Sequence, residues 1–176
     1  MPMPSSETAL DACLSQAAQR FGTPTYVYLT DDIEHRIAQI RASLGRWFHL
    51  SYAMKCNPNP ALLGWLADRI DDLDVSSISE FHLARRAGWD AARASFTGPG
   101  KREVEIRQAV EARIGELVVE NLREARLADR AAADLGLRQD ILIRLAPSSV
   151  PKGFGDQMAG RPSPFGFDIE SADEEL

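Results

Sequence analysis

The feature that most constrains the fold is a regular alternation of short apolar runs with amphipathic helical segments. The apolar runs predict strands at residues 25–29, 49–55, 73–76, 94–98, 117–120 and 141–145. Helical spacing of apolar residues predicts helices at 7–21, from Asp31 or Asp32 to Leu44, and at 60–69, 79–87, 102–112 and 122–135. This order with short links is typical of parallel βα units joined by right-handed crossovers. The sequence therefore predicts an α/β protein.

Two arrangements of parallel βα units fit this alternation, the doubly wound sheet and the (β/α) barrel. The expected strands are apolar runs without strict alternation, as in a sheet whose two faces are both covered. No Gly-x-Gly-x-x-Gly follows the first expected strand, which disfavours the dinucleotide-binding form of the doubly wound sheet. The pattern of elements leaves both arrangements open.

Composition and charge exclude several kinds of partner. The formal net charge is −6 over 176 residues and the basic residues form no block, so we expect no nucleic-acid partner. No apolar run reaches the roughly 20 residues of a membrane span, and residues 1–6 lack a secretory signal pattern. Cys13, Cys56 and the three histidines have no disulfide or metal-binding spacing. We therefore expect a cytoplasmic protein without a metal ion.

Lys55 stands where the second expected strand ends. The run from His49 to Met54 predicts a buried strand, and Asn57-Pro58 ends it. The C-terminal tips of parallel strands are where ligands and catalytic groups gather. Partial desolvation there frees the amine of a lysine to attack a carbonyl and form a Schiff base. The alternative interpretation is a surface lysine that follows a strand.

Polar residues also follow the other expected strands, at the same edge of the predicted sheet. These tip residues are Lys55, residues 74–77, residues 97–101, Glu120, Asn121 and Arg144. Some have local explanations: Ser77 with Glu80 three residues later fits a helix capping box, and Glu120-Asn121 can open a helix. Arg144 lies within the apolar run ILIRL, so its guanidinium must find an anion or reach the rim.

The rim residues carry a resemblance to a known family. YAMKCN at residues 52–57 resembles the Tyr-Ala-x-Lys-x-Asn motif of the fold-type III pyridoxal-phosphate decarboxylases. That family contains the diaminopimelate, ornithine and arginine decarboxylases, and its barrel is shared with alanine racemase. Further segments match in order at family spacing: DVSSISE at 74–80, FTGPGK at 96–101, VEN at 119–121 and IRL at 143–145. SPFG at 163–166 is similar to the family's Ser-Lys-Phe-Gly, with Pro164 in place of the lysine.

This resemblance implies a (β/α)8 TIM barrel of the alanine racemase type, of which about the first five to six βα units are present. It implies pyridoxal 5'-phosphate held on Lys55 through a Schiff base, and decarboxylation of an amino acid with the cofactor ring accepting electrons. By the same resemblance, Asp74 and Arg144 form an ionic rim beside Lys55, and Glu80 supports the helix under the cofactor. The cofactor-binding residues expected in this way are Lys55, Tyr52, Asp74, Ser77, Glu80 and Arg144.

The resemblance also implies an amino-acid substrate and a homodimer when the enzyme is complete. GPGK at residues 98–101 is similar to the segment of members that decarboxylate carrier-linked amino acids. A diamino acid and a carrier-linked amino acid are therefore both candidate substrates, and an acyl-carrier protein is a candidate partner.

The chain is short for the barrel that it resembles. An eight-stranded barrel needs about 250 residues. In the family, the histidine that stacks on the ring, the glycine-rich phosphate loop, the acid facing the pyridine nitrogen and the C-terminal β-domain lie beyond the last match. We expect an N-terminal helical segment at 1–22 and a partial barrel at 23–176, without the β-domain. We also expect that this chain alone does not decarboxylate.

Two other functions stay open at this point. One is an amino-acid racemase built on the same barrel and lysine. The other is a non-catalytic half-barrel that binds a partner protein, which the short length and Pro164 favour. The Ser-x-x-Glu of residues 77–80 and the GPGK of residues 98–101 favour the decarboxylase.

Overall fold

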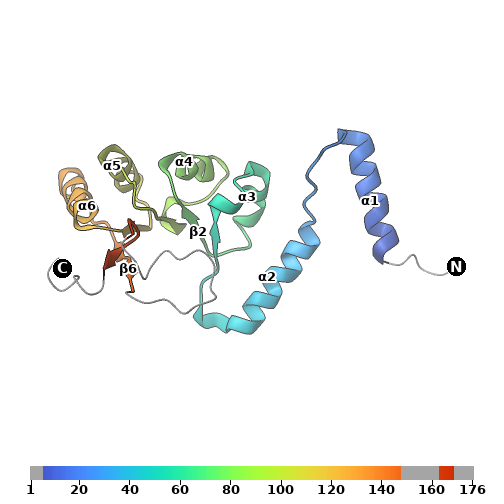
Figure 1. The fold of residues 1–176 in the computed structure, drawn as a ribbon, viewed down its shortest axis with the longest axis horizontal. Coiled ribbons are helices and arrows are strands. Elements are labelled where there is room, and N and C mark those ends of the chain that lie inside the picture. Colours follow the sequence, from blue (N-terminus) through green and yellow to red (C-terminus); the bar gives the residue numbers. More distant parts are fainter. Residues whose placement is uncertain (1–5, 148–162, 169–176) are drawn as a thin grey trace. The chain divides into compact units, whose positions relative to one another are not determined.

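The computed structural model describes residues 6–147 and 163–168, with side chains from Ala9 onward in the first helix. The chain divides into two compact units, Met1–Leu44 and Gly45–Leu176, and each is described by itself. The first unit contains α1 (Ser6–Phe21) and α2 (Thr30–Leu44), which confirms the two helices predicted there (Figure 1). Asp31 and Asp32 lie in the first turn of α2, where negative charge interacts favourably with the helix dipole.

The strand predicted at residues 25–29 is wrong. The segment lies in irregular backbone and belongs to no strand among the described residues. Its side chains are largely exposed, with Tyr26 at 91%. Aromatic and β-branched residues predict a strand only through the neighbours that they pack against across a sheet. This segment has no such neighbour in the part of the chain that the structure describes.

The second unit is built on a five-stranded parallel sheet in the order β1-β2-β3-β4-β5. The strands are β1 (Ser51–Ala53), β2 (Asp72–Val75), β3 (Ala94–Phe96), β4 (Glu116–Val119) and β5 (Ile141–Ile143). The helices between them are α3 (Pro60–Leu66), α4 (Ile78–Arg86), α5 (Glu103–Glu111) and α6 (Leu122–Leu135). These nine elements confirm the predicted alternation, with each strand shorter than or equal to its predicted run.

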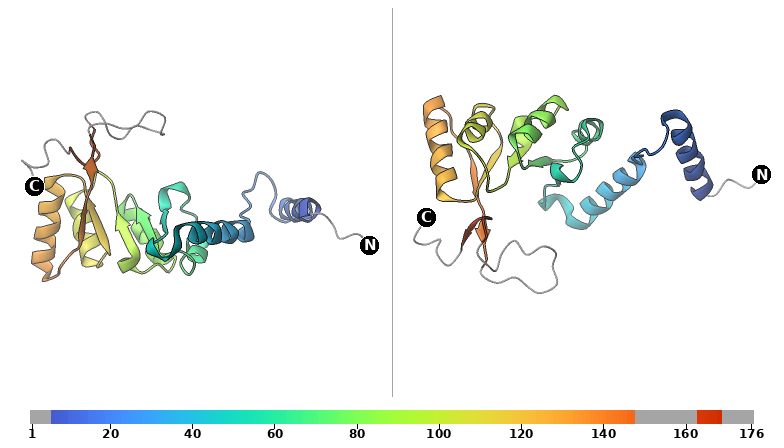
Figure 2. Two further views of the ribbon diagram at one scale, coloured as in Figure 1. Left: turned by 90° about the horizontal axis from the view of Figure 1, so that it is seen from below. Right: turned by 45° about the horizontal axis from the view of Figure 1, so that its top comes forward.

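The strand order decides between the two arrangements that the sequence left open. A doubly wound sheet reverses its strand order at a switch point, whereas this order is consecutive. Right-handed crossovers between consecutive parallel strands place every connecting helix on the same side. Figure 1 shows α3 to α6 in a row along one side of the sheet, and Figure 2 shows the same row from another angle. The second unit is therefore a segment of a (β/α) barrel.

Burial alternates along β2, β3 and β4, contrary to the expectation that both faces are covered, whereas β1 and β5 at the sheet edges have no buried residue. The side chains toward the helices are buried, as with Leu73, Val75 and Phe96. Asp74 and Ser95, which are paired in register on the other face, are only half-buried. Within the described residues, only the helix side of the sheet is fully packed. In a closed barrel, the other face would be the interior.

Arg93 joins the end of α3 to the strand layer. Its guanidinium donates to the carbonyl oxygens of Asp71 at 2.7 Å, Ala67 at 2.8 Å and Ile70. It also lies 4.8 Å from the ring centroid of the buried Trp89. Ala67 follows the last residue of α3, and Ile70 and Asp71 lie just before β2. This single side chain therefore satisfies three backbone carbonyls of the connection between α3 and β2.

A second, small sheet follows β5. Arg144 separates β5 from β6 (Leu145–Ala146), which pairs in parallel with β7 (Phe167–Asp168). Gly166, at φ +79°, precedes β7, and a Cβ at this position would lie 2.7 Å from the carbonyl oxygen of Arg144. The close approach explains the glycine of the SPFG segment. The sequence also predicts a loop rich in Pro, Gly and Ser from 147 to 164, and this segment lies mostly outside the described residues.

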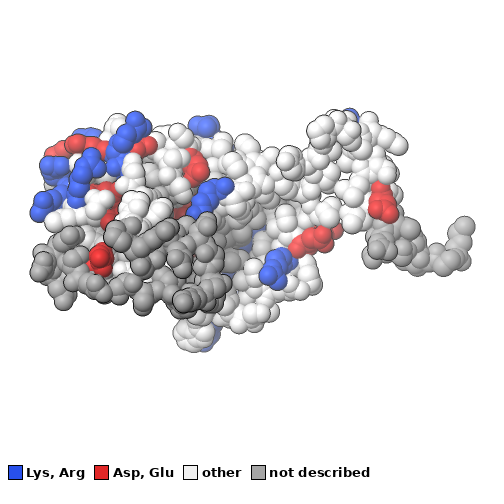
Figure 3. Space-filling view, in the orientation of Figure 1, with Lys and Arg blue, Asp and Glu red and all other residues white. Residues whose placement is uncertain are grey.

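Charged side chains of both signs mix on the surface of the helix layer. Figure 3 shows them interspersed over α5 and α6, where Arg107 and Asp134 form an ion pair at 2.9 Å. No basic face stands out in this view. In the described part of the chain, no helix has the length and apolar character needed to cross a membrane.

Candidate functional site

A hollow of about 550 Å³ lies at the C-terminal tips of the strands. This volume is within the range of about 300–1,000 Å³ that is typical of small-ligand sites. Residues from four strand tips and from the segment before β7 line it, among them Lys55, Ser77, Thr97, Gly98, Arg144 and Phe165. The tip residues that the sequence singled out therefore converge in part on one cavity.

Lys55 lies one 3-10 turn beyond β1. The turn (Met54–Cys56) is anchored by the fully buried Met54 and closed by a hydrogen bond from the Asn57 N–H to the Met54 carbonyl at 3.1 Å. The Lys55 side chain is exposed and lines the hollow. No hydrogen bond or ion pair joins it to another residue that the structure describes. Its amine is therefore available to a ligand.

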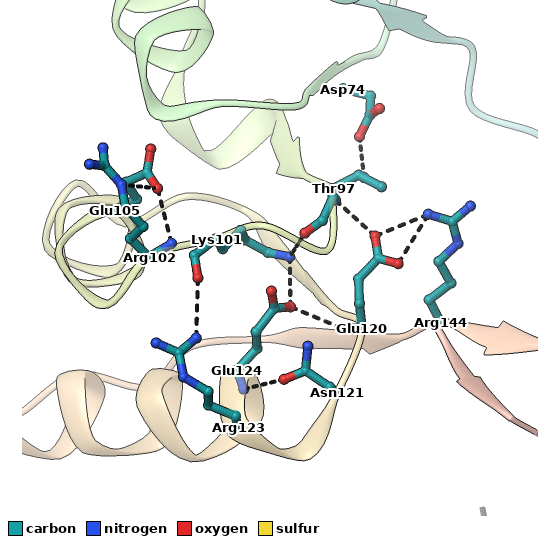
Figure 4. Close-up of polar contacts among 11 residues, drawn as sticks. Asp74, Thr97, Lys101, Arg102, Glu105, Glu120, Asn121, Arg123, Glu124 and Arg144 are labelled. Atoms are coloured by element: carbon teal, nitrogen blue, oxygen red, sulfur yellow. Dashed lines mark hydrogen bonds and ion pairs between the residues drawn. The ribbon is translucent and has the colours of Figure 1, made fainter. Parts of the chain in front are cut away.

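Arg144 finds the anion that its place in an apolar run requires. Its Nη1 donates to Oε1 of Glu120 at 3.0 Å and to Oε2 at 3.1 Å (Figure 4). Glu120 is buried and also accepts a hydrogen bond from the Gly98 N–H at 2.9 Å. The guanidinium lies 4.9 Å from the ring centroid of Phe165. The prediction that Arg144 needs an anionic partner is confirmed, and Glu120 is that partner.

The ionic rim of Asp74 and Arg144 beside Lys55, which the resemblance implied, stays a prediction. Asp74 Oδ1 accepts hydrogen bonds from Ser95 Oγ at 2.7 Å and from Thr97 Oγ1 at 2.5 Å. Asp74 does not line the hollow. Two hydroxyl groups on the next strand thus satisfy this carboxylate. Its role toward a cofactor stays a prediction.

Ser77 caps α4, as the sequence indicated. Its Oγ accepts from the Glu80 N–H at 3.2 Å. The Glu80 carboxylate accepts from the N–H of Ser76 at 2.6 Å, one residue before the position that a capping box requires. Ser77 lines the hollow and Glu80 does not. Glu80 therefore stabilises the backbone at the start of α4 without facing the hollow.

Tyr52 shapes the Lys55 turn from the strand side. Its hydroxyl donates to the Asn57 carbonyl at 3.1 Å and accepts from Cys56 Sγ at 3.1 Å. Tyr52 does not line the hollow. Its contacts in the described residues therefore hold the turn that presents Lys55.

Sequence reasoning missed a buried ion pair below the hollow. Lys101 Nζ lies 2.8 Å from Glu124 Oε2, and the two side chains are 1% and 0% exposed. Lys101 Nζ also donates to the Gly98 carbonyl at 2.5 Å. The one available signal was the spacing Asn121-x-x-Glu124: Asn121 caps α6 by accepting from the Glu124 N–H at 3.0 Å. That spacing identifies a helix start but not a partner 23 residues away.

Arg102 and Glu105 form a local pair at the start of α5, on the rim of the hollow. Glu105 Oε2 accepts from the Arg102 backbone N–H at 2.9 Å and from its Nε at 3.0 Å. The side-chain hydrogen bond from Arg102 lowers the pKa of Glu105 below its ordinary value. The same bond raises the pKa of Arg102. Both groups therefore stay charged at neutral pH.

The described residues contain no group of three or more His, Cys, Asp and Glu side chains that could hold a metal ion. The groups that line the hollow include the amine of Lys55, the guanidinium groups of Arg102 and Arg144, hydroxyl groups and the backbone of a glycine-rich turn. This set suits an anionic carbonyl compound, because the amine attacks the carbonyl while the other groups bind the anion.

Three comparisons place these motifs in a family. A family model for the pyridoxal-binding domain of pyridoxal-dependent decarboxylases matches residues 30–176. A diaminopimelate decarboxylase of Aquifex aeolicus is 35% identical over 163 residues, covering 92% of this chain and 39% of the relative. The diaminopimelate decarboxylase of Pseudomonas aeruginosa is 36% identical over 135 residues, 76% of this chain and 32% of the relative.

The structure comparison agrees with the sequence comparisons. The crystal structure of diaminopimelate decarboxylase from Helicobacter pylori complexed with L-lysine has a TM-score of 0.73 and 26% identity. It covers 92% of this chain, which corresponds to 42% of that structure. The chain thus spans about two fifths of the length of these proteins. The matches confirm the predicted fold, family and pyridoxal cofactor. The chain belongs to the family of pyridoxal-binding domains of the pyridoxal-dependent decarboxylases.

Proposed function

We propose that Lys55 is the residue that bonds covalently to pyridoxal phosphate, and that the protein decarboxylates an amino acid. The observation that carries this proposal is the position of Lys55: an exposed amine without an ion-pair partner among the described residues, in a hollow shared with Arg144. In a family of pyridoxal-binding domains, such a lysine has a direct chemical use.

The residues of the hollow fit the cofactor. Pyridoxal phosphate has an aldehyde, which an amine attacks, and negative charge, which cations and N–H donors bind. Lys55 supplies the amine, and Arg144 is held within the hollow with 29% of its side chain exposed. Ser77 supplies a hydroxyl at the N-terminus of the nine-residue α4, where the helix dipole favours negative charge.

These side chains would divide the work in the following way. Lys55 Nζ would hold the cofactor at its aldehyde carbon. Arg144, after β5, provides positive charge to the hollow, and the buried Glu120 carboxylate balances that charge. Tyr52 and Glu80 hold the Lys55 turn and the start of α4. When bound, the cofactor supplies a ring that withdraws the electron pair left as carbon dioxide departs.

For the substrate, we propose a diamino acid, because the relatives that match over most of this chain are diaminopimelate decarboxylases. The carrier-linked alternative depended on residues 98–101, and there Lys101 is buried against Glu124. That lysine lines the hollow, but its side chain is only 1% exposed and is paired with Glu124, so no observation favours the carrier-linked substrate. An acyl-carrier partner, a homodimer, a cytoplasmic location and the division at residues 22 and 23 stay predictions.

The first test is an absorption titration of the protein with pyridoxal phosphate. We expect a new band in the wild type that is absent in Lys55→Ala. Cys56→Ala is the matched control, because it alters the same turn and leaves the amine in place. A band that persists in Lys55→Ala would remove Lys55 from this role.

The reaction type is tested by the products formed from a diamino acid. Release of carbon dioxide supports decarboxylation, whereas loss of optical activity without gas release indicates a racemase. The chain spans about two fifths of its relatives' length, so we expect turnover only when the rest of such an enzyme is supplied. Turnover by residues 1–176 alone would contradict that expectation.

A further inference from the structure

Below the hollow, the described residues form a closed ring of hydrogen bonds (Figure 4). Lys101 Nζ binds the Gly98 carbonyl and Glu124 Oε2. The same Glu124 oxygen accepts from the Glu120 N–H at 3.0 Å. The Glu120 carboxylate accepts from the Gly98 N–H at 2.9 Å, which closes the ring. Both backbone polar groups of Gly98 are therefore hydrogen-bonded: the N–H to Glu120 and the carbonyl to Lys101.

The ring connects two loops that line or support the same cavity. One is the turn between β3 and α5, which carries Gly98 and Lys101. The other is the junction of β4 and α6, which carries Glu120 and Glu124. Arg144 binds to this ring through Glu120. The orientation of its guanidinium thus depends on a chain of contacts that begins at Lys101.

Stability alone does not account for this arrangement. Replacing a buried ion pair with apolar side chains of similar volume is often neutral or stabilising. Here, moreover, Glu124 Oε1 is buried and has no hydrogen-bond partner in the described structure, so the pair is incompletely compensated. What the pair does provide is a charged donor on the Gly98 carbonyl and a charged acceptor for the Glu120 N–H.

The turn that the ring holds is one that needs support. Gly98 has φ +126°, a backbone conformation that residues with a side chain rarely adopt. For glycine it is one of many accessible backbone conformations. A glycine-rich turn without fixed backbone contacts samples several conformations. With its N–H and C=O both bound, Gly98 presents one conformation to the hollow.

We propose that Lys101 and Glu124 are positioning residues of the cofactor site: they fix the Gly98 turn and, through Glu120, the guanidinium of Arg144. Neither residue touches the ligand, and both act through the groups that do. The part of this proposal that concerns the cofactor rests on the proposed function of the Lys55 hollow. The part that concerns Gly98 does not.

The test compares wild type with the double variant Lys101→Met/Glu124→Leu, which replaces the pair by apolar side chains of similar size. The matched control is Arg107→Met/Asp134→Leu, which removes the exposed ion pair at 2.9 Å between α5 and α6 and leaves the ring intact. Three quantities are measured in the full chain: the midpoint of thermal unfolding, the exchange rate of the Gly98 amide proton by NMR, and the Kd for pyridoxal phosphate.

We expect the double variant to fold with a lower unfolding midpoint than the wild type, because the Gly98 carbonyl and the Glu120 N–H lose their partners. We expect its Gly98 amide to exchange about tenfold faster or more, because the turn is no longer held through the Gly98 carbonyl and the Glu120 N–H and therefore opens more often. The Kd for pyridoxal phosphate should rise by about ten- to a hundredfold, because the Gly98 turn and the Arg144 guanidinium would no longer be held in position. The control variant should change neither the Gly98 exchange nor the Kd.

A folded double variant with wild-type Gly98 exchange would overturn the proposal. The pair would then only occupy space in the interior and would not fix the Gly98 turn. If the double variant does not fold, Glu124→Gln, which keeps the shape and removes the charge, replaces it with the same readouts. The proposed function fails separately, if the wild type gives no Lys55-dependent band; the Gly98 exchange still decides the role of the ring in that case.

Discussion

Arg144 and Glu120 share one nitrogen between two oxygens: Arg144 Nη1 lies 3.0 Å from Oε1 and 3.1 Å from Oε2 of Glu120. The Glu120 side chain is 0% exposed, whereas that of Arg144 is 29% exposed. The carboxylate is therefore enclosed while the guanidinium reaches the hollow. This asymmetry means that the two residues are not equivalent when either one is removed.

We predict that Arg144→Met destabilises the protein more than Glu120→Gln does. Removal of the guanidinium leaves the enclosed Glu120 carboxylate without its counter-ion, which costs about 3 kcal/mol for a buried pair. Glu120→Gln removes the buried charge itself and keeps an oxygen that can accept from the Gly98 N–H. Denaturant unfolding of the two variants checks this order. The reverse order would show that the carboxylate is hydrated or neutral.

Arg93 provides a prediction about stability away from the site. Arg93→Met keeps the apolar stem and removes the hydrogen bonds to three backbone carbonyls in the connection between α3 and β2. The loss should lower the unfolding free energy by about 2–4 kcal/mol, because buried carbonyl groups are left unpaired. Arg86→Met, at an exposed position of α4, is the control and should change stability by less than about 0.5 kcal/mol. Equal effects of the two variants would mean that Arg93 contributes only surface charge.

Glu105 provides a pH prediction with a definite sign. Its pKa in the folded protein is lowered by the Arg102 hydrogen bond, relative to the ordinary value of 4.5. A lowered folded pKa stabilises the protein above the ordinary pKa, and this contribution is lost as the pH falls through the folded value. The difference in melting temperature between wild type and Glu105→Gln should therefore be constant near neutral pH and shrink below about pH 4.5. A difference that grows on acidification would contradict the assignment.

Gly166 provides a prediction for the small sheet. A Cβ there would lie 2.7 Å from the Arg144 carbonyl, and the φ of +79° is unfavourable for other residues. Gly166→Ala should therefore cost about 1–3 kcal/mol and displace β7 together with the Phe165 ring beside Arg144. Gly136→Ala, at φ +63° with no atom within 4 Å of the added Cβ, is the control. It measures the cost of the positive φ without a steric clash. A similar cost for both would mean that the close approach to Arg144 contributes nothing.

The helix–strand alternation of the second unit followed from apolar periodicity, because each element there packs against neighbours close in sequence. The predicted helix at 122–135 matches α6 (Leu122–Leu135) residue for residue, since Asn121 caps one end and Gly136 ends the other. The strand at 25–29 failed for the opposite reason. Its residues have strand propensity, but a strand forms only with a pairing partner, which local sequence does not specify.

The site was predictable in position and less so in its contacts. That Lys55 would follow a strand tip, and that Arg144 would need an anion, came from residue type and burial. That Glu120 is this anion, and that Asp74 binds Ser95 and Thr97, depends on register between strands more than 20 residues apart. A lysine after Gly-Pro-Gly also gives no local sign of burial, so the role of Lys101 emerged only from the fold.

The most direct test of the central claim is to trap the bond between protein and cofactor. The chain contains only three lysines, Lys55, Lys101 and Lys152. Treatment of the protein with pyridoxal phosphate and then borohydride, followed by peptide mass spectrometry, identifies which of them carries the cofactor. The account predicts labelling of Lys55 at stoichiometric cofactor, with none at the buried Lys101. Labelling of Lys152 with an unmodified Lys55 would contradict it.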